Sequence, residues 1–215
     1  MKTFLNTLGE IELEQINGPD GRSYGGKGFK YPSVTTVTSL HTEEGIRAWR
    51  AAVGAEAANR ISRIASARGT AVHGLCEAYL KTGEAKTVAH AEMFGAIRPH
   101  LDLIDNIHCL ESKMVSHKLK VAGTVDVIGE YRKKLAVIDF KTSNKLKPFK
   151  WVDHYFMQTA AYACMYYEAT GTLVDRLVLI IGVDGGECQI FEQKTAPWLI
   201  EFKKLRERFA NERGR

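Results

Sequence analysis

Residues 123–145 read GTVDVIGEYRKKLAVIDFKTSNK, and this stretch determines how the rest of the chain is arranged. It holds two apolar runs that are typical of β-strands, separated by the basic segment Arg132-Lys133-Lys134. This pattern predicts a β-hairpin with a tight connection. Because most positions in both runs are apolar, we expect both faces of the hairpin to be covered and the hairpin to lie at the centre of a sheet.

Three ionisable residues interrupt the apolar runs, Asp126 in the first and Asp139 and Lys141 in the second. Burying a charge is costly unless the charge is paired or binds a metal. Side chains two positions apart on a strand point to the same face, and pairing through the turn brings Asp126 close to Asp139. Two carboxylates beside an ammonium group predict a site for a hard cation. A structural ion pair is the alternative that this stretch alone leaves open.

Composition indicates a single soluble domain over residues 1–215. The chain is 45% hydrophobic and 26% charged, and its net charge of +5 weakly favours a polyanionic partner. Its four cysteines are scattered without the CxxC spacing, which predicts reduced thiols rather than disulfides or a zinc site. No apolar run is long enough to span a membrane and no apolar signal core precedes the domain, so we expect a cytoplasmic protein without a membrane partner.

The first third of the chain predicts strands followed by helices. Residues 1–30 favour an N-terminal β-hairpin extension, with its turn at residues 17–21. The β-branched run at residues 31–40 predicts an edge strand, on which the hydroxyls of Ser33 and Thr35 could contact a phosphate backbone. A helix is expected to begin at Thr42 and to bury one apolar stripe, with arginines mostly off that stripe. The stripe contains Ile46, Trp49, Val53, Ala57, Ile61 and Ile64.

A second helix is expected after Gly69-Thr70, and it carries His73 and Glu77 on one face. Residues 89–107 predict a third helix, and residues 110–119 predict a strand that contains Glu111. After the hairpin, basic residues alternate with aromatic ones in a pattern that suits single-stranded nucleic acid, although a solvated loop would give the same pattern. The residues concerned are Lys145, Lys147, Phe149, Lys150 and Trp151.

The remaining elements follow from periodicity and turn signals. A helix carries Gln158 and Tyr162 on one face and ends at Gly171. Residues 177–183 and 186–193 predict a strand pair joined through Asp184-Gly185, and a last helix starts at Pro197.

Four blocks in this order resemble the PD-(D/E)xK nucleases of the RecB-like branch: GTAVHGLCE (69–77), GTVD (123–126), VIDFKT (137–142) and QTAAY (158–162). The finer resemblance is to mitochondrial genome maintenance exonucleases and related phage exonucleases, and it adds the YPSVT block and the KPF sequence after the hairpin. It spans roughly residues 31–186. The resemblance implies a restriction-endonuclease-like α/β (mixed α+β) core, in which a central mixed β-sheet is flanked by helices.

The resemblance also implies a chemistry, namely metal-dependent hydrolysis of phosphodiester bonds at the ends of single-stranded DNA. Asp126 and Asp139, with His73 and the backbone carbonyl of Phe140, would hold Mg²⁺ or Mn²⁺. Lys141 would stabilise charge on the phosphate, and Gln158 and Tyr162 would orient Lys141 or the phosphate. Glu77 and Glu111 are supporting candidates. No iron–sulfur cluster is expected, because the clustered cysteines that it needs are absent.

Without an import sequence, we expect a phage or bacterial enzyme of DNA replication, recombination or repair, with proteins of those processes as potential partners. The sequence predicts no particular oligomeric state. Two alternatives stay open at this point: a duplex-acting endonuclease of the same fold, and a non-catalytic nucleic-acid-binding module.

Overall fold

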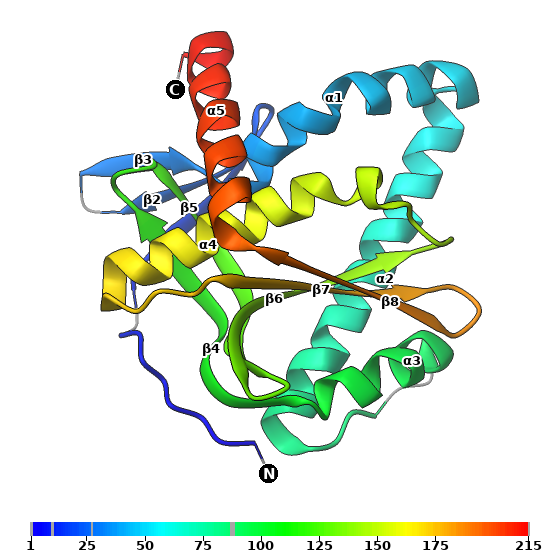
Figure 1. Ribbon diagram of the computed structural model, residues 1–215. Coiled ribbons are helices and arrows are strands. Elements are labelled where there is room, and N and C mark those ends of the chain that lie inside the picture. Colours follow the sequence, from blue (N-terminus) through cyan, green and yellow to red (C-terminus); the bar gives the residue numbers. More distant parts are fainter. Residues whose placement is uncertain (1, 10, 27, 87–88, 215) are drawn as a thin grey trace.

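The computed structural model describes residues 2–9, 11–26, 28–86 and 89–214. Its centre is a five-stranded mixed sheet in the order β4-β5-β6-β7-β8, with helices packed on both faces (Figure 1). This confirms the predicted α/β class. The strands are β4 Ile104–Ser116, β5 Val121–Tyr131, β6 Lys134–Ser143, β7 Arg176–Val183 and β8 Glu187–Lys194.

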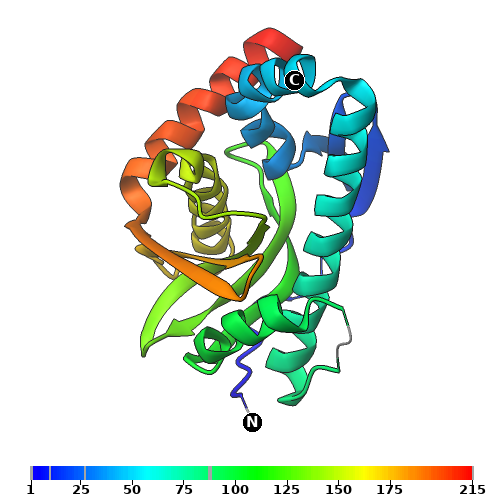
Figure 2. The same ribbon diagram turned by 90° about the vertical axis from the view of Figure 1, so that its right-hand side faces the viewer.

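The two faces of the sheet are covered by different helices, as the rotated view in Figure 2 shows. Helices α4 (Asp153–Thr170) and α5 (Thr195–Arg213) cover one face together with the start of α1 (Val34–Val53). Helices α2 (Ala55–Thr82) and α3 (Ala91–Leu101) cover the other face. No helix of the described residues is long and apolar enough to cross a membrane.

The predicted hairpin is confirmed as β5 and β6. Arg132 and Lys133 form its turn with φ values of 52° and 62°, the left-handed conformation that a type I′ turn requires. Strand β6 then runs parallel to β7, with α4 crossing between them. Strands β5 and β6 are buried over most of their length, as their apolar composition predicts.

Strands β5 and β6 separate within the sheet. Their pairing ends at Val127 and Ile138; beyond that point β5 pairs with β4, while β6 pairs with β7. Side chains of α4 reach this opening. A Cβ atom added at Gly123 on β5 would lie 2.6 Å from the Tyr162 hydroxyl, so only glycine leaves room for that ring. The opening lies where the sequence places its buried charges.

The N-terminal extension is a three-stranded antiparallel sheet rather than a hairpin alone. It contains β1 (Glu14–Gly18), β2 (Gly21–Gly26) and β3 (Phe29–Pro32), and the predicted turn at residues 17–21 joins β1 to β2. Tyr24 packs with Leu13 and Ala122 in a small core between this sheet and β5.

The predicted edge strand at residues 31–40 and the helix start at Thr42 are wrong, because α1 begins at Val34. Ser33 is the N-cap, and its hydroxyl accepts a hydrogen bond of 3.0 Å from the Thr36 amide. Val34 and Val37 are fully buried on one helix face. Tertiary burial of that face outweighs the strand preference of β-branched residues.

The predicted helix boundary at Gly69-Thr70 is also wrong. Helix α2 runs through it without a break, and the chain turns sharply at Gly54 instead, where φ is 85° and ψ is 151°. Gly69 faces β6, since a Cβ atom added there would lie 3.8 Å from the Thr142 hydroxyl. Likewise the third helix ends at Leu101 rather than at residue 107, and β4 starts at Ile104.

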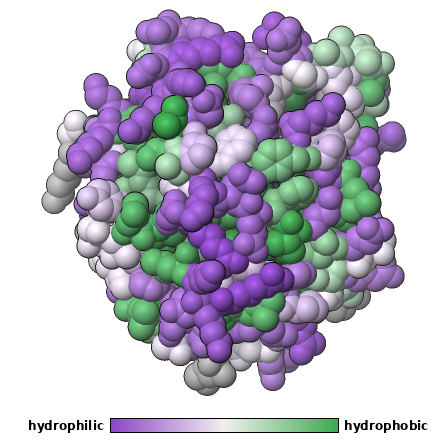
Figure 3. Space-filling view, viewed as in Figure 1, coloured by the Kyte–Doolittle hydropathy of each residue, from purple (hydrophilic) through white to green (hydrophobic). Residues whose placement is uncertain are grey.

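Most of the apolar stripe predicted to be buried is exposed instead, while Trp49 and Ala57 are half-buried. Ile46 is 48% exposed, Ile61 41% and Ile64 59%, because α1 and α2 project beyond the sheet at their junction. We call this projection the α1–α2 corner, residues 43–66. Figure 3 shows apolar surface over it at the upper right. The described structure therefore leaves the isoleucines of this corner open to solvent, together with Arg47, Arg60 and Arg63.

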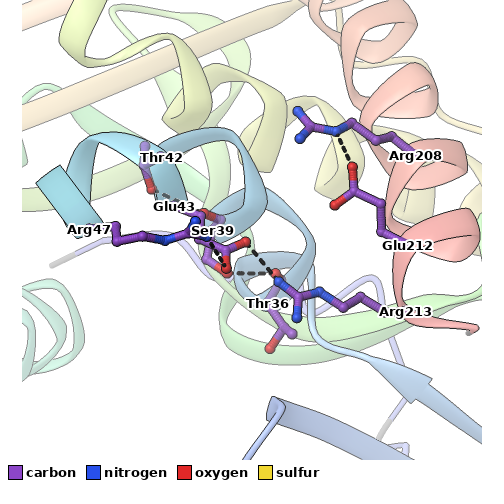
Figure 4. A network of polar contacts seen from close by, with 8 residues as sticks. All are labelled: Thr36, Ser39, Thr42, Glu43, Arg47, Arg208, Glu212 and Arg213. Carbon is purple, nitrogen blue, oxygen red and sulfur yellow. Dashed lines mark hydrogen bonds and ion pairs between the residues drawn. The ribbon is translucent and has the colours of Figure 1, made fainter.

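The base of the corner is fastened to the C-terminal helix. Glu43 on α1 accepts hydrogen bonds from Arg213 at 2.7 Å and from Arg47 at 3.3 Å (Figure 4). These contacts hold the end of α5 against α1, while the corner itself extends away from them.

We expect Gly54→Ala to lower the stability of the fold by about 1–3 kcal/mol, because a φ of 85° with an extended ψ is strained for any residue with a Cβ atom. Nothing lies within 4 Å of that added atom, so strain and not collision is the cause. Gly45→Ala, in the interior of α1 with the same open surroundings, is the matched control and should stabilise by about 0.5–1 kcal/mol. Thermal unfolding of both variants checks the prediction; equal shifts would contradict it.

Candidate active site

Three potential metal ligands converge at the opening between β5 and β6. One ligand atom each from His73, Glu111 and Asp126 lies within 4.8 Å of the others. Glu111 and Asp126 face each other across β4 and β5, since the residue pairs on either side of them are in register. His73 reaches them from α2, and its Nδ1 is 3.5 Å from Asp126 Oδ2. Two carboxylates and an imidazole form a donor set that suits a divalent cation.

Glu111 is held in a strained backbone conformation. Its φ is 47°, the left-handed region that costs a residue with a side chain about 1–2 kcal/mol. Such strain is concentrated at functional sites, where the surrounding structure imposes it.

The site concentrates negative charge. Burial, followed by the nearby carboxylates of Asp126, Glu77 and Asp139, raises the pKa of Glu111 to about 8. The described side chains therefore supply more carboxylate charge than the site can stabilise without a cation, which fits a metal centre.

Buried Asp139 and half-buried Lys141 form an ion pair beside these ligands. Asp139 is 2% exposed, its Oδ2 contacts Lys141 Nζ, and its Oδ1 accepts a hydrogen bond of 2.9 Å from Gln158 Nε2. Burial is the largest cause of the raised pKa of Asp139, with Lys141 opposing it and Asp126 adding to it. Burial acts to lower the pKa of Lys141, but Asp139 and Asp126 outweigh it and the net shift is upward. Lys141 is therefore protonated at neutral pH.

Asp126 links the two separated strands. Its Oδ2 accepts a hydrogen bond of 2.8 Å from the backbone amide of Phe140, a bond that bridges the opening. This contact orients the carboxylate toward His73. The role of the Phe140 carbonyl as a metal ligand stays a prediction.

Helix α4 brings Gln158 and Tyr162 to the site, as their spacing on one helix face predicts. In this structure Gln158 binds Asp139 rather than Lys141. Tyr162 is buried, and burial, with the charges of Asp126 and Asp139, raises its pKa well above the ordinary value. Its phenol is therefore protonated.

Sequence reasoning grouped Tyr155 with the basic and aromatic residues after the hairpin but gave it no role at the site, where its ring centroid lies 5.0 Å from Lys141 Nζ. A signal was present, because Tyr155 precedes Gln158 by three positions and so shares its helix face. Glu77, a supporting candidate, pairs with Lys81 at 2.5 Å and lies close enough to Glu111 to affect its pKa.

The predicted DNA-contacting residues divide into exposed and engaged groups. Trp151 is 45% exposed, and Lys145 Nζ lies 5.2 Å from its ring centroid; Lys150 and Thr35 are exposed as well. Phe149 is partly exposed but packs against Phe156, Phe191 and Trp198. Burial lowers the pKa of Lys147. Ser33 is buried and caps α1.

The chain is similar in sequence to proteins that are named as exonucleases. The chain is 26% identical over 147 residues to human mitochondrial genome maintenance exonuclease 1, an alignment that covers 63% of this chain. It is 45% identical over 53 residues to the mouse protein of that name, covering 25% of this chain and 16% of that protein. The chain spans 40% of the length of the human relative. No family model matches the chain.

Among solved structures, the chain is similar to a crystal structure named as a candidate exonuclease from Eubacterium rectale. The TM-score is 0.48 and the identity 14%, over 67% of this chain and 65% of that one.

Proposed function

We propose that the chain is a metal-dependent nuclease of the RecB-like PD-(D/E)xK type that hydrolyses phosphodiester bonds in single-stranded DNA from a free end. The observation that carries the proposal is the convergence of His73, Glu111 and Asp126 beside the Asp139–Lys141 pair. A phage or bacterial cytoplasmic setting is part of the proposal.

The donor set fits Mg²⁺ or Mn²⁺, because carboxylate oxygens suit both ions and an imidazole suits Mn²⁺ in particular. His73, Glu111 and Asp126 would hold the ion, and Asp139 borders them. Such a cation supplies Lewis-acid activation of the phosphoryl oxygen and lowers the pKa of a bound water.

Lys141 takes the role of an electrostatic stabiliser in this proposal. As a protonated ammonium it can stabilise charge that develops on the phosphate. It cannot act as a general base at neutral pH in that state. Gln158 fixes the position of Asp139, which in turn fixes Lys141. Tyr162, protonated and buried against Gly123, can donate a hydrogen bond to an oxygen at the site.

A preference for single strands is supported by the exposed pair of Lys145 and Trp151. Base–aromatic stacking stabilises a bound single strand by about 1–3 kcal/mol per base, and paired bases cannot present their faces in this way. In this proposal the Lys145 ammonium, 5.2 Å from the Trp151 ring centroid, contacts the phosphate that accompanies a stacked base.

The α1–α2 corner supports the requirement for a free end. It projects above α4 in Figure 1, and it carries Arg60 and Arg63 exposed on its surface. Arg50 donates a hydrogen bond of 2.7 Å to Asn59, which ties α1 to α2 across the turn at Gly54. A strand that passes beneath a closed corner has to enter by its end.

We expect linear single-stranded DNA to be shortened in the presence of Mn²⁺ or Mg²⁺, while circular single-stranded DNA persists. Duplex DNA should bind through charge alone and lose affinity steeply with salt. End-labelled linear and circular substrates, resolved on denaturing gels, check this. Nicking of the circle as fast as the linear strand would show an open cleft and overturn the end requirement. If neither the linear nor the circular strand were cleaved, the nuclease assignment itself would be overturned.

A further inference from the structure

A second cluster of titratable side chains lies beyond Lys141, where α1 meets the start of α4. His41 Nε2 is 3.1 Å from Asp153 Oδ2, and His154 Nδ1 is 3.6 Å from Asp153 Oδ1. The two imidazole rings lie face to face at 6.4 Å. None of these three residues has a role in the candidate active site as described above.

The cluster is connected to the candidate active site through Tyr155. The ring centroids of His154 and Tyr155 are 3.9 Å apart, and Lys141 Nζ lies 5.0 Å from the Tyr155 ring centroid. Lys141, Tyr155, His154 and His41 therefore form a continuous line from the ion pair on β6 to α1.

Asp153 places a negative charge beside both imidazoles. The Asp153 carboxylate accepts a hydrogen bond of 2.7 Å from the His154 backbone amide, and its other oxygen contacts His41. The cluster also sits at the N-terminus of α4, an 18-residue helix whose dipole adds positive charge there. Burial is the largest cause that lowers the pKa of His154 to about 4; Asp153 opposes this shift, and the smaller effects of His41 and Lys141 add to it.

His154 is also short of hydrogen-bond partners. Its Nδ1 is buried without a hydrogen-bond partner among the described residues. A buried imidazole nitrogen without a partner can donate a hydrogen bond to an incoming anion, which would draw a proton onto the ring. The His41 side chain is 39% exposed, so the cluster is open to solvent on its α1 side.

We propose that His41 and His154 bind a phosphate group of the substrate strand next to the one held at Lys141. The inference rests on the proposed nuclease function and adds a second phosphate subsite to it. A strand passing below the α1–α2 corner would then be held at two successive phosphates, one at the metal ligands and Lys141 and one at the histidine pair.

The test combines protein variants with a neutral phosphate analogue. Single-stranded oligonucleotides each carry one methylphosphonate linkage, placed at successive positions on either side of the cleaved bond, and are compared with the all-phosphate strand. For the His41→Ala, His154→Ala double variant we expect KM on the all-phosphate strand to rise about tenfold to a hundredfold, as loss of charge-assisted hydrogen bonds would give. At one linkage position the methylphosphonate should raise KM for the wild type and not for the double variant.

A double variant with His154→Gln in place of His154→Ala keeps a hydrogen-bond donor at that position. It should recover part of the affinity that the double alanine variant loses, which would not be expected if only packing had been lost. His117→Ala, on the turn between β4 and β5, is the matched control and should leave KM unchanged. Thermal unfolding confirms that each variant folds. An unchanged KM in the double variant, or methylphosphonate effects equal in both proteins at every position, overturns the subsite while leaving the nuclease intact. A wild type that cleaves no strand overturns the proposed function instead.

Discussion

Asp139→Asn and Lys141→Ala should each lower kcat on linear single-stranded DNA by about 10²–10³-fold, the effect of removing one stabiliser of transition-state charge. The two side chains form one ion pair that Gln158 holds in place. Because they act as a unit, the double variant should lose little more than either single variant. Measurement of kcat on end-labelled oligonucleotides for all three variants checks both statements.

The matched control for this series is Asp175→Asn. Asp175 also pairs with a lysine, Lys194 at 2.9 Å, but both side chains are largely exposed and the pair lies at the other end of β7. Its loss should leave kcat unchanged, because exposed ion pairs contribute little. Folding is checked separately by thermal unfolding. Cleavage by either site variant at the wild-type rate would remove Asp139 and Lys141 from the proposed chemistry.

Glu111→Gln should raise the Kd for Mn²⁺ by at least about tenfold to a hundredfold, since even residues that only support metal ligands have effects of that size. Without metal, the same change should raise the melting temperature, because it relieves repulsion from Asp126, Glu77 and Asp139. His73→Ala should weaken metal binding similarly. Isothermal titration with Mn²⁺, followed by unfolding scans with and without the ion, measures both effects independently of activity.

The control for the second series is Glu130→Gln, on the same strand as Asp126 but four positions away and outside the described ligand cluster. It should change neither the Kd nor the melting temperature in the absence of metal by a comparable amount. If Glu111→Gln left Mn²⁺ binding unchanged while lowering stability, Glu111 would be a structural residue of β4.

The sequence predicted the central hairpin correctly because local signals agree there. Strand-forming runs flank a short basic turn, and the buried charges within them mark the candidate site. The spacing of Gln158 and Tyr162 also placed both residues on one face of α4. These predictions depend on neighbours within a few positions along the chain.

The errors lie where distant parts of the chain decide the outcome. Residues 34–40 prefer strands locally, but the burial of Val34 and Val37 against the sheet and the Ser33 cap make them helical. Either Gly54 or Gly69 could end a helix on the sequence alone. In the structure Gly54 has a positive φ and ends α1, whereas Gly69 lies inside α2 against β6. Glu111 ranked only as a supporting candidate, because its left-handed φ and its place opposite Asp126 depend on the pairing of β4 with β5.

The separation of β5 from β6 makes the Phe140 amide a built-in spectroscopic probe. In an unbroken hairpin that N–H would sit in the ladder between the two strands, but here its partner is a side-chain oxygen of Asp126. Any event that changes the electron density on this carboxylate changes the Phe140 ¹H–¹⁵N resonance directly. Titration of Mn²⁺ or Mg²⁺ into a ¹⁵N-phenylalanine-labelled sample could therefore follow metal occupancy at Asp126 through this one amide, in solution and without any substrate being cleaved.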